Sequence, residues 1–316
     1  MKRKILYLFS IVLIIISALS CSDNSSTNPA ETDYIAQILA EVSIDSLMSY
    51  VGILSGETSV SVNGQVQTIS SRHKEFEGNE IAADYIQQKL TGYGLTITTQ
   101  QFSATGKNVL GKMLGSLYPD DIYIICAHYD DMPNGPTSPG ADDNASGTAA
   151  VIEAARILSQ YNFEYTVIFA LWDEEEQGLV GSRYYAANAA LNSLNILGVI
   201  NLDMISWETD NDPILKVQRS AADETANITD ILLDVDGKYD LWVVPEIEDG
   251  VSGSDHKSFA EQGYPAILLI EDYIGDWNAN YHTPQDRIEN MNRNYFLASS
   301  KLAIGTLSRL LMVVVN

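Results

Sequence analysis

Residues 123–130 read Tyr-Ile-Ile-Cys-Ala-His-Tyr-Asp, a short apolar run that ends in a histidine, a tyrosine and an aspartate. A continuous apolar run is typical of a strand that is buried on both faces of a sheet. Three later stretches have the same character, at residues 165–172, 199–204 and 266–270. These four runs predict the central strands of one sheet, with polar and acidic residues close to their carboxyl ends.

Helical patterns separate the predicted strands. Apolar side chains recur at helical spacing over residues 32–54, 80–90, 146–160 and 294–315, whereas residues 95–102 alternate as a strand does. Strands that alternate with helices predict an α/β fold. We therefore expect three layers: a mixed, mostly parallel, twisted sheet with helices on both faces.

The composition suits a globular protein with a large core. The chain has 316 residues, of which 46% are hydrophobic and 19% are charged, and this length fits one α/β domain. The formal net charge is −24. This charge argues against a nucleic-acid partner, because phosphate binding requires a basic surface.

The first twenty residues have the pattern of a signal peptide. Residues 2–4 are basic, and residues 5–19 are apolar apart from two serines, a stretch that is short for a membrane span. Residues 18–21, Ala-Leu-Ser-Cys, resemble a bacterial lipobox in which Cys21 is lipidated after cleavage. We expect an exported, membrane-anchored lipoprotein on the periplasmic or cell-surface side. An ordinary secretory signal, giving a secreted protein, is the alternative.

The rest of the chain divides into a tether and one domain. Residues 21–32 are polar and predict a flexible tether, and residues 33–316 predict a single domain. If Cys21 is lipidated, Cys126 is the one remaining cysteine, so no intrachain disulfide is expected. We interpret Cys126 as a buried, inert thiol.

Five short segments carry histidines or clustered acidic residues, and four of them follow a predicted strand or lead into a helix. They are 127–130 (AHYD), 139–147 (PGADDNASG), 173–178 (DEEEQG), 201–204 (NLDM) and 281–286 (YHTPQD). In open α/β sheets, ligands bind at the edge formed by the carboxyl ends of the strands. The sequence therefore predicts that these segments meet at that edge.

The side chains in these segments are ones that zinc accepts. Neutral imidazoles and carboxylates bind zinc, and a catalytic zinc keeps one position open for water. Two ions about 3.5–4 Å apart need a shared carboxylate and terminal ligands on each side. The segments offer two histidines, two aspartates and one glutamate for this purpose, and one further carboxylate as a base.

The ordered set of segments resembles the M28 family of zinc aminopeptidases, of the bacterial leucyl type. The resemblance spans nearly the whole mature chain and includes Ser71-Arg72-His73 and Gly253-Ser254-Asp255-His256. Each motif alone is weak, but five motifs in this order are specific. The resemblance implies a metallo-exopeptidase with two Zn²⁺ per chain, acting on peptides with a free N-terminus.

The resemblance also implies five metal ligands, two for each zinc ion and one carboxylate shared by both. His128 and Asp203 would hold one ion, and Glu176 and His282 would hold the other. Asp143 would be the shared carboxylate.

Three more residues would serve catalysis if the resemblance holds. Glu175 would be the general base that takes a proton from a water bridging the two ions. Asp130 would orient the ring of His128. Tyr281 would donate a hydrogen bond to the oxyanion of the intermediate.

Neighbouring residues leave alternatives open. Glu174 is the alternative within the acidic run, and Asp142 is the alternative within the aspartate pair. We interpret His256 as a structural hydrogen-bonding group rather than a ligand. The pair at residues 283–284, Thr-Pro, predicts the start of a helix, which Asp286 would cap.

Three rival functions remain at this point. A glutaminyl cyclase shares the fold implied by the resemblance but uses one zinc ion. A carboxypeptidase acting on small peptides would need a basic residue in the pocket, and Arg183, Arg219 and Lys257 are the candidates. A non-catalytic, lipid-anchored binding protein is the third, and an intact set of ligands with an intact base argues against it.

Overall fold

The computed structural model describes residues 32–222 and 224–314. The predicted signal peptide, the cysteine predicted to be lipidated and nearly all of the predicted tether lie outside these residues. From Tyr34 onward the chain forms one compact unit.

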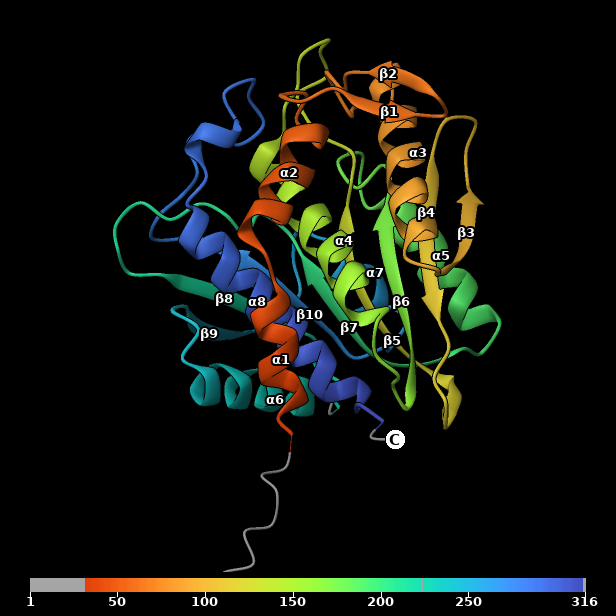
Figure 1. Cartoon of the computed structure of the whole chain (residues 1–316), viewed down its shortest axis with the longest axis vertical. Helices are drawn as coiled ribbons and strands as arrows, with labels where there is room; N and C mark the ends of the chain where they lie inside the picture. The colour runs from red at the N-terminus through yellow and green to blue at the C-terminus, as the bar shows by residue number, and fades with distance from the viewer. Residues whose placement is uncertain (1–31, 223, 315–316) are drawn as a thin grey trace, which may run out of the picture. The chain divides into compact units, whose positions relative to one another are not determined.

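The centre of this unit is an eight-stranded sheet with the order β3-β4-β6-β5-β7-β10-β8-β9 (Figure 1). The strands are β3 (Thr96–Gln101), β4 (Lys107–Met113), β5 (Tyr118–His128), β6 (Tyr165–Trp172), β7 (Asn195–Leu202), β8 (Ile214–Arg219), β9 (Val244–Asp249) and β10 (Ala266–Glu271). The four central strands β6, β5, β7 and β10 are parallel, and β8 pairs parallel with β9. The pairs β3-β4, β4-β6 and β10-β8 are antiparallel. The prediction of a mixed, mostly parallel sheet is confirmed.

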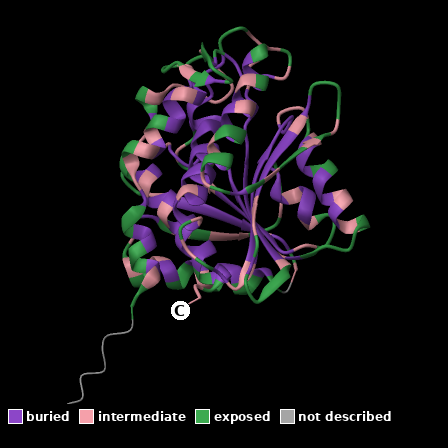
Figure 2. Cartoon of the chain, turned by 45° about the vertical axis from the view of Figure 1, so that its right-hand side comes forward, coloured by how far each residue is buried: buried purple, intermediate pink, exposed green. Residues whose placement is uncertain are grey.

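Helices cover both faces of the sheet, as predicted (Figures 1 and 2). One face packs against α1 (Tyr34–Glu41), α2 (Ile44–Leu54), α3 (Glu77–Gly92), α4 (Gly147–Leu158), α6 (Thr225–Tyr239) and α8 (Arg293–Leu311). The other face packs against α5 (Val180–Leu191) and α7 (His256–Ala260). In the described residues no single helix is long and apolar enough to cross a membrane, although α1 and α2, bent by 47°, together meet that criterion.

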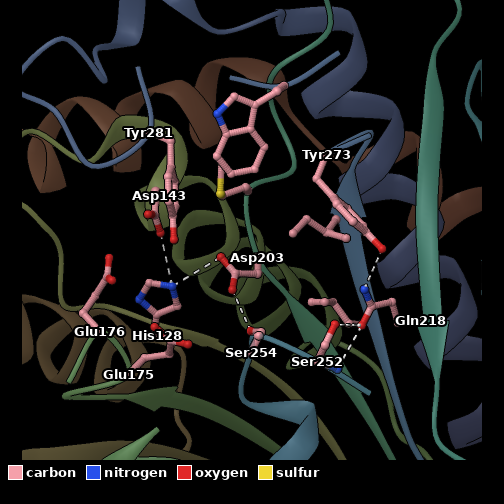
Figure 3. Close-up of a pocket in the computed structure, with 15 residues that line it drawn as sticks. His128, Asp143, Glu175, Glu176, Asp203, Gln218, Ser252, Ser254, Tyr273 and Tyr281 are labelled. Carbon is pink, nitrogen blue, oxygen red and sulfur yellow. Dashed lines mark hydrogen bonds and ion pairs between the residues drawn. The ribbon is translucent and has the colours of Figure 1, made fainter. Parts of the chain in front are cut away.

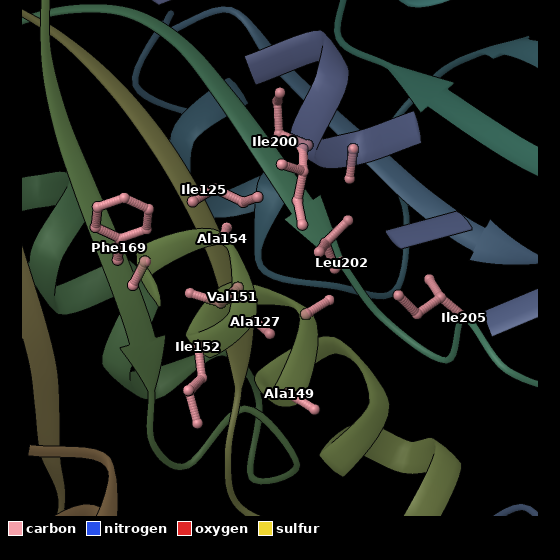
Figure 4. Packing of buried hydrophobic residues seen from close by; sticks show 14 of the residues in the cluster. Ile125, Ala127, Ala149, Val151, Ile152, Ala154, Phe169, Ile200, Leu202 and Ile205 are labelled. Carbon is pink, nitrogen blue, oxygen red and sulfur yellow. The ribbon is translucent and has the colours of Figure 1, made fainter. Parts of the chain in front are cut away.

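The sheet separates two hydrophobic cores, and successive side chains of β5 point alternately into one core and the other. Ile125 and Ala127 face the larger core under α4, while Ile124 and Cys126 face the smaller core under α5 and α7. Figure 4 shows Val151 of α4 close to Ile125 and Ala127 of β5. Burying one such aliphatic side chain contributes about 1.5–3 kcal/mol, which explains why β5 reads as an unbroken apolar run.

The segment predicted as one helix over residues 32–54 is two helices. The helix is interrupted between α1 and α2. Ser43 caps the start of α2, and its side chain accepts a hydrogen bond from the Ser46 N–H at 3.3 Å. The Ser43 N–H donates to the buried carboxylate of Glu153 on α4 at 2.9 Å. The apolar spacing continues through the break, so periodicity alone does not reveal it.

Several elements were not predicted. They are β4, β8, β9, α5, α6, α7 and a hairpin of β1 (Val60–Val62) with β2 (Gln65–Gln67). The three missed strands of the main sheet lie toward its edges and contain charged residues, such as Lys216 in β8. They therefore lack the unbroken apolar pattern of a central strand.

The parallel central strands bring their carboxyl ends to one edge. The register pairs His128, the last residue of β5, with Trp172, the last residue of β6. Leu202 at the end of β7 pairs with Leu269 near the end of β10. The loops that follow these strands therefore begin side by side.

Candidate active site

The predicted ligands come from five separate segments that meet at this edge, and Figure 3 shows four of these ligands, all except His282. One ends β5, one follows β6, one follows β7, one precedes α4 and one lies in the loop after β10. They are His128, Glu176, Asp203, Asp143 and His282, here called the donor cluster. The predicted convergence is thus found in the structure, although the roles of these residues remain predictions.

One half of the donor cluster surrounds the ring of His128. Its Nε2 atom lies 3.3 Å from Oδ1 of Asp203 and 3.4 Å from Oδ1 of Asp143. All three side chains are buried. They form one group whose ligand atoms lie within 4.8 Å of one another.

The other half surrounds the ring of His282. Its Nε2 atom lies 2.9 Å from Oε2 of Glu176 and 3.1 Å from Oδ2 of Asp143. Asp143 therefore belongs to both halves and directs one carboxylate oxygen toward each histidine. This is the geometry expected of a carboxylate shared between two metal ions.

Buried polar atoms in the cluster lack ordinary partners. Among the described residues, Oδ2 of Asp143, Oε1 of Glu176 and Nε2 of His282 are buried and make no hydrogen bond. Buried polar groups are otherwise almost always hydrogen-bonded. Two imidazoles and three carboxylates with unsatisfied atoms facing one another fit divalent zinc.

The electrostatics of the cluster favour positive charge. Burial opposes protonation of His128, but the carboxylates of Asp203 and Glu175 outweigh it and raise its pKa well above the usual value. Burial also opposes protonation of His282, yet the adjacent carboxylates of Asp143 and Glu176 raise its pKa to about 10. The carboxylates thus stabilise cations at this position.

Glu175 and Glu176 are sequence neighbours with different surroundings. Glu176 contacts His282, whereas Glu175 lines the cleft and has a ligand atom within 4.8 Å of those of His128 and Glu176. Burial raises the pKa of Glu175 well above its usual value, and burial raises that of Glu176 to about 8. Glu175 is thus buried at the wall of the cleft, beside the donor cluster.

Asp130 links the ring of His128 to the acidic loop. One of its oxygens lies 3.4 Å from Nδ1 of His128 and accepts the Glu175 N–H at 3.1 Å. The other oxygen accepts the Glu176 N–H at 3.2 Å. A carboxylate behind a metal-binding histidine fixes the ring orientation, and this one also holds the backbone of both glutamates.

The two alternative acids point away from the cluster. Asp142 accepts hydrogen bonds from the hydroxyl of Ser206 at 2.6 Å and from the amide of Asn278 at 2.9 Å. Glu174 accepts from Ser103 at 3.2 Å and forms an ion pair with Lys74 at 3.3 Å. Their side chains are therefore occupied elsewhere.

The prediction for the segment after His282 was wrong. No helix starts at Thr283; the chain continues through turns to a short 3₁₀ helix at Ile288–Asn290. Asp286 instead accepts the backbone N–H groups of Asp142 at 3.0 Å and Asp143 at 2.9 Å. It holds the loop that carries the shared carboxylate, a contact across more than 140 residues that no local pattern reveals.

Two further residues were missed as parts of the site. The Ser254 hydroxyl donates to Oδ2 of Asp203 at 2.6 Å and accepts from the side chain of Asn201 at 2.7 Å. The guanidinium of Arg72, fully buried, donates to the carbonyls of Tyr129 and Gly140 at 2.7 and 2.8 Å. Both residues stand in the motifs that carry the family resemblance, which is the signal that could have found them.

The remaining predicted residues lie near the site but differ in their contacts. Tyr281 lines the cleft and stacks on His282 with ring centroids 3.7 Å apart. His256 begins α7, is fully buried and makes no hydrogen bond to the described residues. The interpretation of His256 as a buried structural residue agrees with this position, whereas the predicted hydrogen bond has no partner among the described residues. Cys126 is buried, and its thiol lies 3.4 Å from Oδ1 of Asn201.

A cleft with a volume of about 170 Å³ opens beside the donor cluster. Its apolar walls come from Met204, Leu268, Ile270 and Trp277. Gln218, Ser252 and Tyr273 line its far end (Figure 3). None of the described residues that line the cleft is a lysine or arginine.

The protein has the α/β fold of the zinc exopeptidases. This class is defined by the order of the strands and by the imidazole and carboxylate groups at the edge of the sheet. Residues 108–307 match the model of Peptidase family M28. The chain belongs to this family, and the resemblance found in the sequence is confirmed.

The names of individual relatives are consistent with membership of this family. A probable zinc metalloprotease of Pyrenophora tritici-repentis is 28% identical over 281 residues, which cover 72% of this chain and 57% of the relative. A probable leucine aminopeptidase 1 of Trichophyton verrucosum is 24% identical over 288 residues, covering 84% and 77%. The structure of the Legionella pneumophila LapA aminopeptidase matches with a TM-score of 0.76 at 23% identity, covering 88% of this chain and 74% of LapA. The chain thus spans less than two thirds of the zinc metalloprotease and shares its fold with LapA.

Proposed function

We propose that the protein is a zinc-dependent aminopeptidase that removes the N-terminal residue from peptides with two Zn²⁺ per chain. One observation carries the proposal: Asp143 directs its two oxygens toward two histidines, each of which has a further carboxylate partner. A single metal ion would not require a shared carboxylate with a complete donor set on either side. Family membership and relatives named as aminopeptidases support the same activity.

The residues have distinct tasks in this proposal. His128 and Asp203 would hold one ion, Glu176 and His282 the other, and Asp143 both. Bound zinc supplies a Lewis acid that polarises a carbonyl and lowers the pKa of water.

The proton transfer is assigned to the chain itself. Glu175 takes a proton from the attacking water and passes it to the leaving amine. Asp130 contacts both the ring of His128 and the backbone N–H of Glu175, and so fixes their positions relative to each other. Tyr281 donates a hydrogen bond to the oxygen of the carbonyl under attack.

The charge of the cleft favours an amine end of the substrate. Its carboxylates suit an ammonium group, and the described lining offers no cation to bind a C-terminal carboxylate. Arg219 pairs with Asp249, and Arg183 lies 4.0 Å from Glu261. Neither these two arginines nor Lys257 lines the cleft, which argues against the carboxypeptidase alternative.

Metal content and blocked substrates test the proposal. The purified protein is expected to bind close to two zinc ions, to hydrolyse aminoacyl p-nitroanilides and to leave the N-acetylated forms intact. One zinc ion together with cyclisation of N-terminal glutamine would replace the proposal with a cyclase. Equal hydrolysis of acetylated and free substrates would contradict exopeptidase action.

We also propose that the protein is exported and anchored by lipid on Cys21, on the strength of the sequence pattern of residues 1–21. Expression in bacteria with radiolabelled palmitate tests this point. The wild type should carry label and sediment with membranes, and Cys21→Ser should do neither. An unlabelled, soluble wild type would overturn it.

A further inference from the structure

The far end of the cleft is formed by one face of β8 and β10. Gln218 of β8 pairs in register with Leu268 of β10, so their side chains lie on the same face of the sheet. On the opposite face, Val217 and Leu269 are buried in the core under the helices. The face that carries Gln218 and Leu268 lines the cleft instead.

A chain of hydrogen bonds fixes the side chain of Gln218 (Figure 3). Its amide nitrogen donates to the Tyr273 hydroxyl at 3.0 Å, and that hydroxyl donates to Glu248 at 2.6 Å. Its amide oxygen accepts from the backbone N–H and the hydroxyl of Ser252, both at 3.2 Å. Gln218, Ser252 and Tyr273 are called the polar floor below.

The polar floor has hydrogen-bonding capacity left for a ligand. An amide nitrogen has two protons, and within the described residues that of Gln218 has one acceptor, the Tyr273 hydroxyl. The Ser252 hydroxyl donates to Gln218, so its oxygen can still accept. One free donor and one free acceptor therefore lie beside each other, which matches the end of a carboxamide.

The charges around the polar floor disfavour an anionic ligand. Glu248 lies next to Gln218 in register on β9, directly behind the Tyr273 hydroxyl. Lys216 lies 3.5 Å from Glu248, but it also pairs with Glu246 and Asp272. One cation among three carboxylates leaves this wall of the cleft negative, so a carboxylate at the polar floor would be repelled.

A two-residue segment of the chain connects the polar floor to the donor cluster. Ser254 contacts Asp203 of the donor cluster, and Ser252 contacts Gln218 of the polar floor. The Cα atoms of Ser252 and Ser254 therefore lie at most about 7 Å apart, so the polar floor is within reach of a long side chain whose backbone lies at the donor cluster. The apolar walls between the two ends, including Met204 and Ile270, would pack against the methylene groups of such a side chain.

We propose that the polar floor makes the cleft selective for an N-terminal residue with a long, uncharged, amide-ended side chain, with glutamine as the reference case and Gln218 as the specificity residue. This inference rests on the proposed aminopeptidase function. A hydrocarbon side chain of equal length displaces water from the floor and leaves the Gln218 donor unpaired. A glutamate side chain brings a second negative charge beside Glu248.

Three p-nitroanilides of equal side-chain length test the selectivity: glutamine, norleucine and glutamate. The wild type should give the highest kcat/KM with glutamine and the lowest with glutamate. In Gln218→Met, the ratio of kcat/KM for glutamine over norleucine should fall about 3- to 10-fold, the value of one neutral hydrogen bond. The norleucine rate itself reports whether the variant is folded, because misfolding lowers both rates equally.

Gln262→Met is the matched control, because it makes the same exchange at an exposed position beyond α7. Its substrate ratio should equal that of the wild type. An unchanged ratio in Gln218→Met, or a wild type that prefers norleucine, would overturn the inference.

Calorimetry with free l-glutamine and l-norleucine separates the cleft from catalysis. Tighter binding of glutamine that is lost in Gln218→Met supports the inference even if no p-nitroanilide is cleaved, in which case the proposed function alone fails. Equal affinities for the two amino acids would overturn the inference even if cleavage is observed.

Discussion

At the residue scale, two adjacent glutamates have separate tasks. Glu176 contacts His282 within the donor cluster, and Glu175 faces the cleft outside it. The backbone N–H groups of both are held by Asp130. A single exchange at each position should therefore separate metal binding from proton transfer.

We expect Glu175→Gln to keep its zinc and to lose at least about 100-fold in kcat, because the amide cannot accept the proton of water. Glu176→Gln is the matched comparison and should lose zinc as well as activity. Metal analysis and steady-state kinetics on the same preparations check both. A Glu175→Gln variant with wild-type turnover would remove Glu175 from the role of base.

Asp286 should control metal affinity without touching the metal. It accepts the backbone N–H groups of Asp142 and Asp143 and so holds the shared carboxylate in place. We expect Asp286→Ala to weaken zinc binding about 10- to 100-fold, as for other carboxylates that orient a ligand. Competition with a fluorescent zinc chelator measures this, and unchanged affinity would show that the loop is held by other contacts.

At the scale of elements, the start of α4 lies against the end of β7. A Cβ atom at Gly147 would collide with the Asn144 side chain and with the carbonyl of Leu202. Asp143 and Asp203 flank this contact in sequence, so the close approach of helix and strand also sets the position of two donors. Glycine is needed here for space.

We expect Gly147→Ala to lower the free energy of unfolding by about 1–3 kcal/mol through overpacking and to lower zinc affinity as well. Gly237→Ala on α6 is the control, because its Cβ would meet nothing within 4 Å at an exposed helical position. That variant should gain up to about 1 kcal/mol. Urea unfolding compares the two, and equal stability of both variants would contradict the contact.

At the scale of the whole molecule, the metals should stabilise the fold. The donor cluster gathers three carboxylates in a chain whose formal net charge is −24. Zinc binds the folded state, and at 100 times the dissociation constant one site adds about 2.7 kcal/mol. Removing zinc should therefore lower the melting temperature by several degrees.

Differential scanning calorimetry with and without 1,10-phenanthroline checks this shift. Re-addition of zinc should restore the melting temperature, whereas Asp203→Ala should respond much less to either treatment. Identical melting curves of the wild type with and without chelator would contradict a structural contribution of the metal.

Local patterns identified the centre of the sheet but not its borders. Unbroken apolar runs such as residues 165–172 report burial on both faces, so the central strands were recognisable. Strand β8 carries Lys216 and Gln218 because one of its faces lines the cleft. The polar residues of that face interrupt the apolar run by which a central strand is recognised. The break at Ser43 depends on Glu153, which is distant in sequence.

The amino-acid sequence by itself determined the α/β class, the edge at which the strands end and the types of side chain gathered there. These properties follow from short-range periodicity and from the chemistry of the motifs. Only the tertiary structure decided that Asp143 faces both histidines while Asp142 turns to Ser206, that Asp286 holds their loop, and that Gln218 closes the cleft. The direction of a side chain depends on backbone dihedral angles and on contacts with segments far away in the chain, which no local pattern encodes.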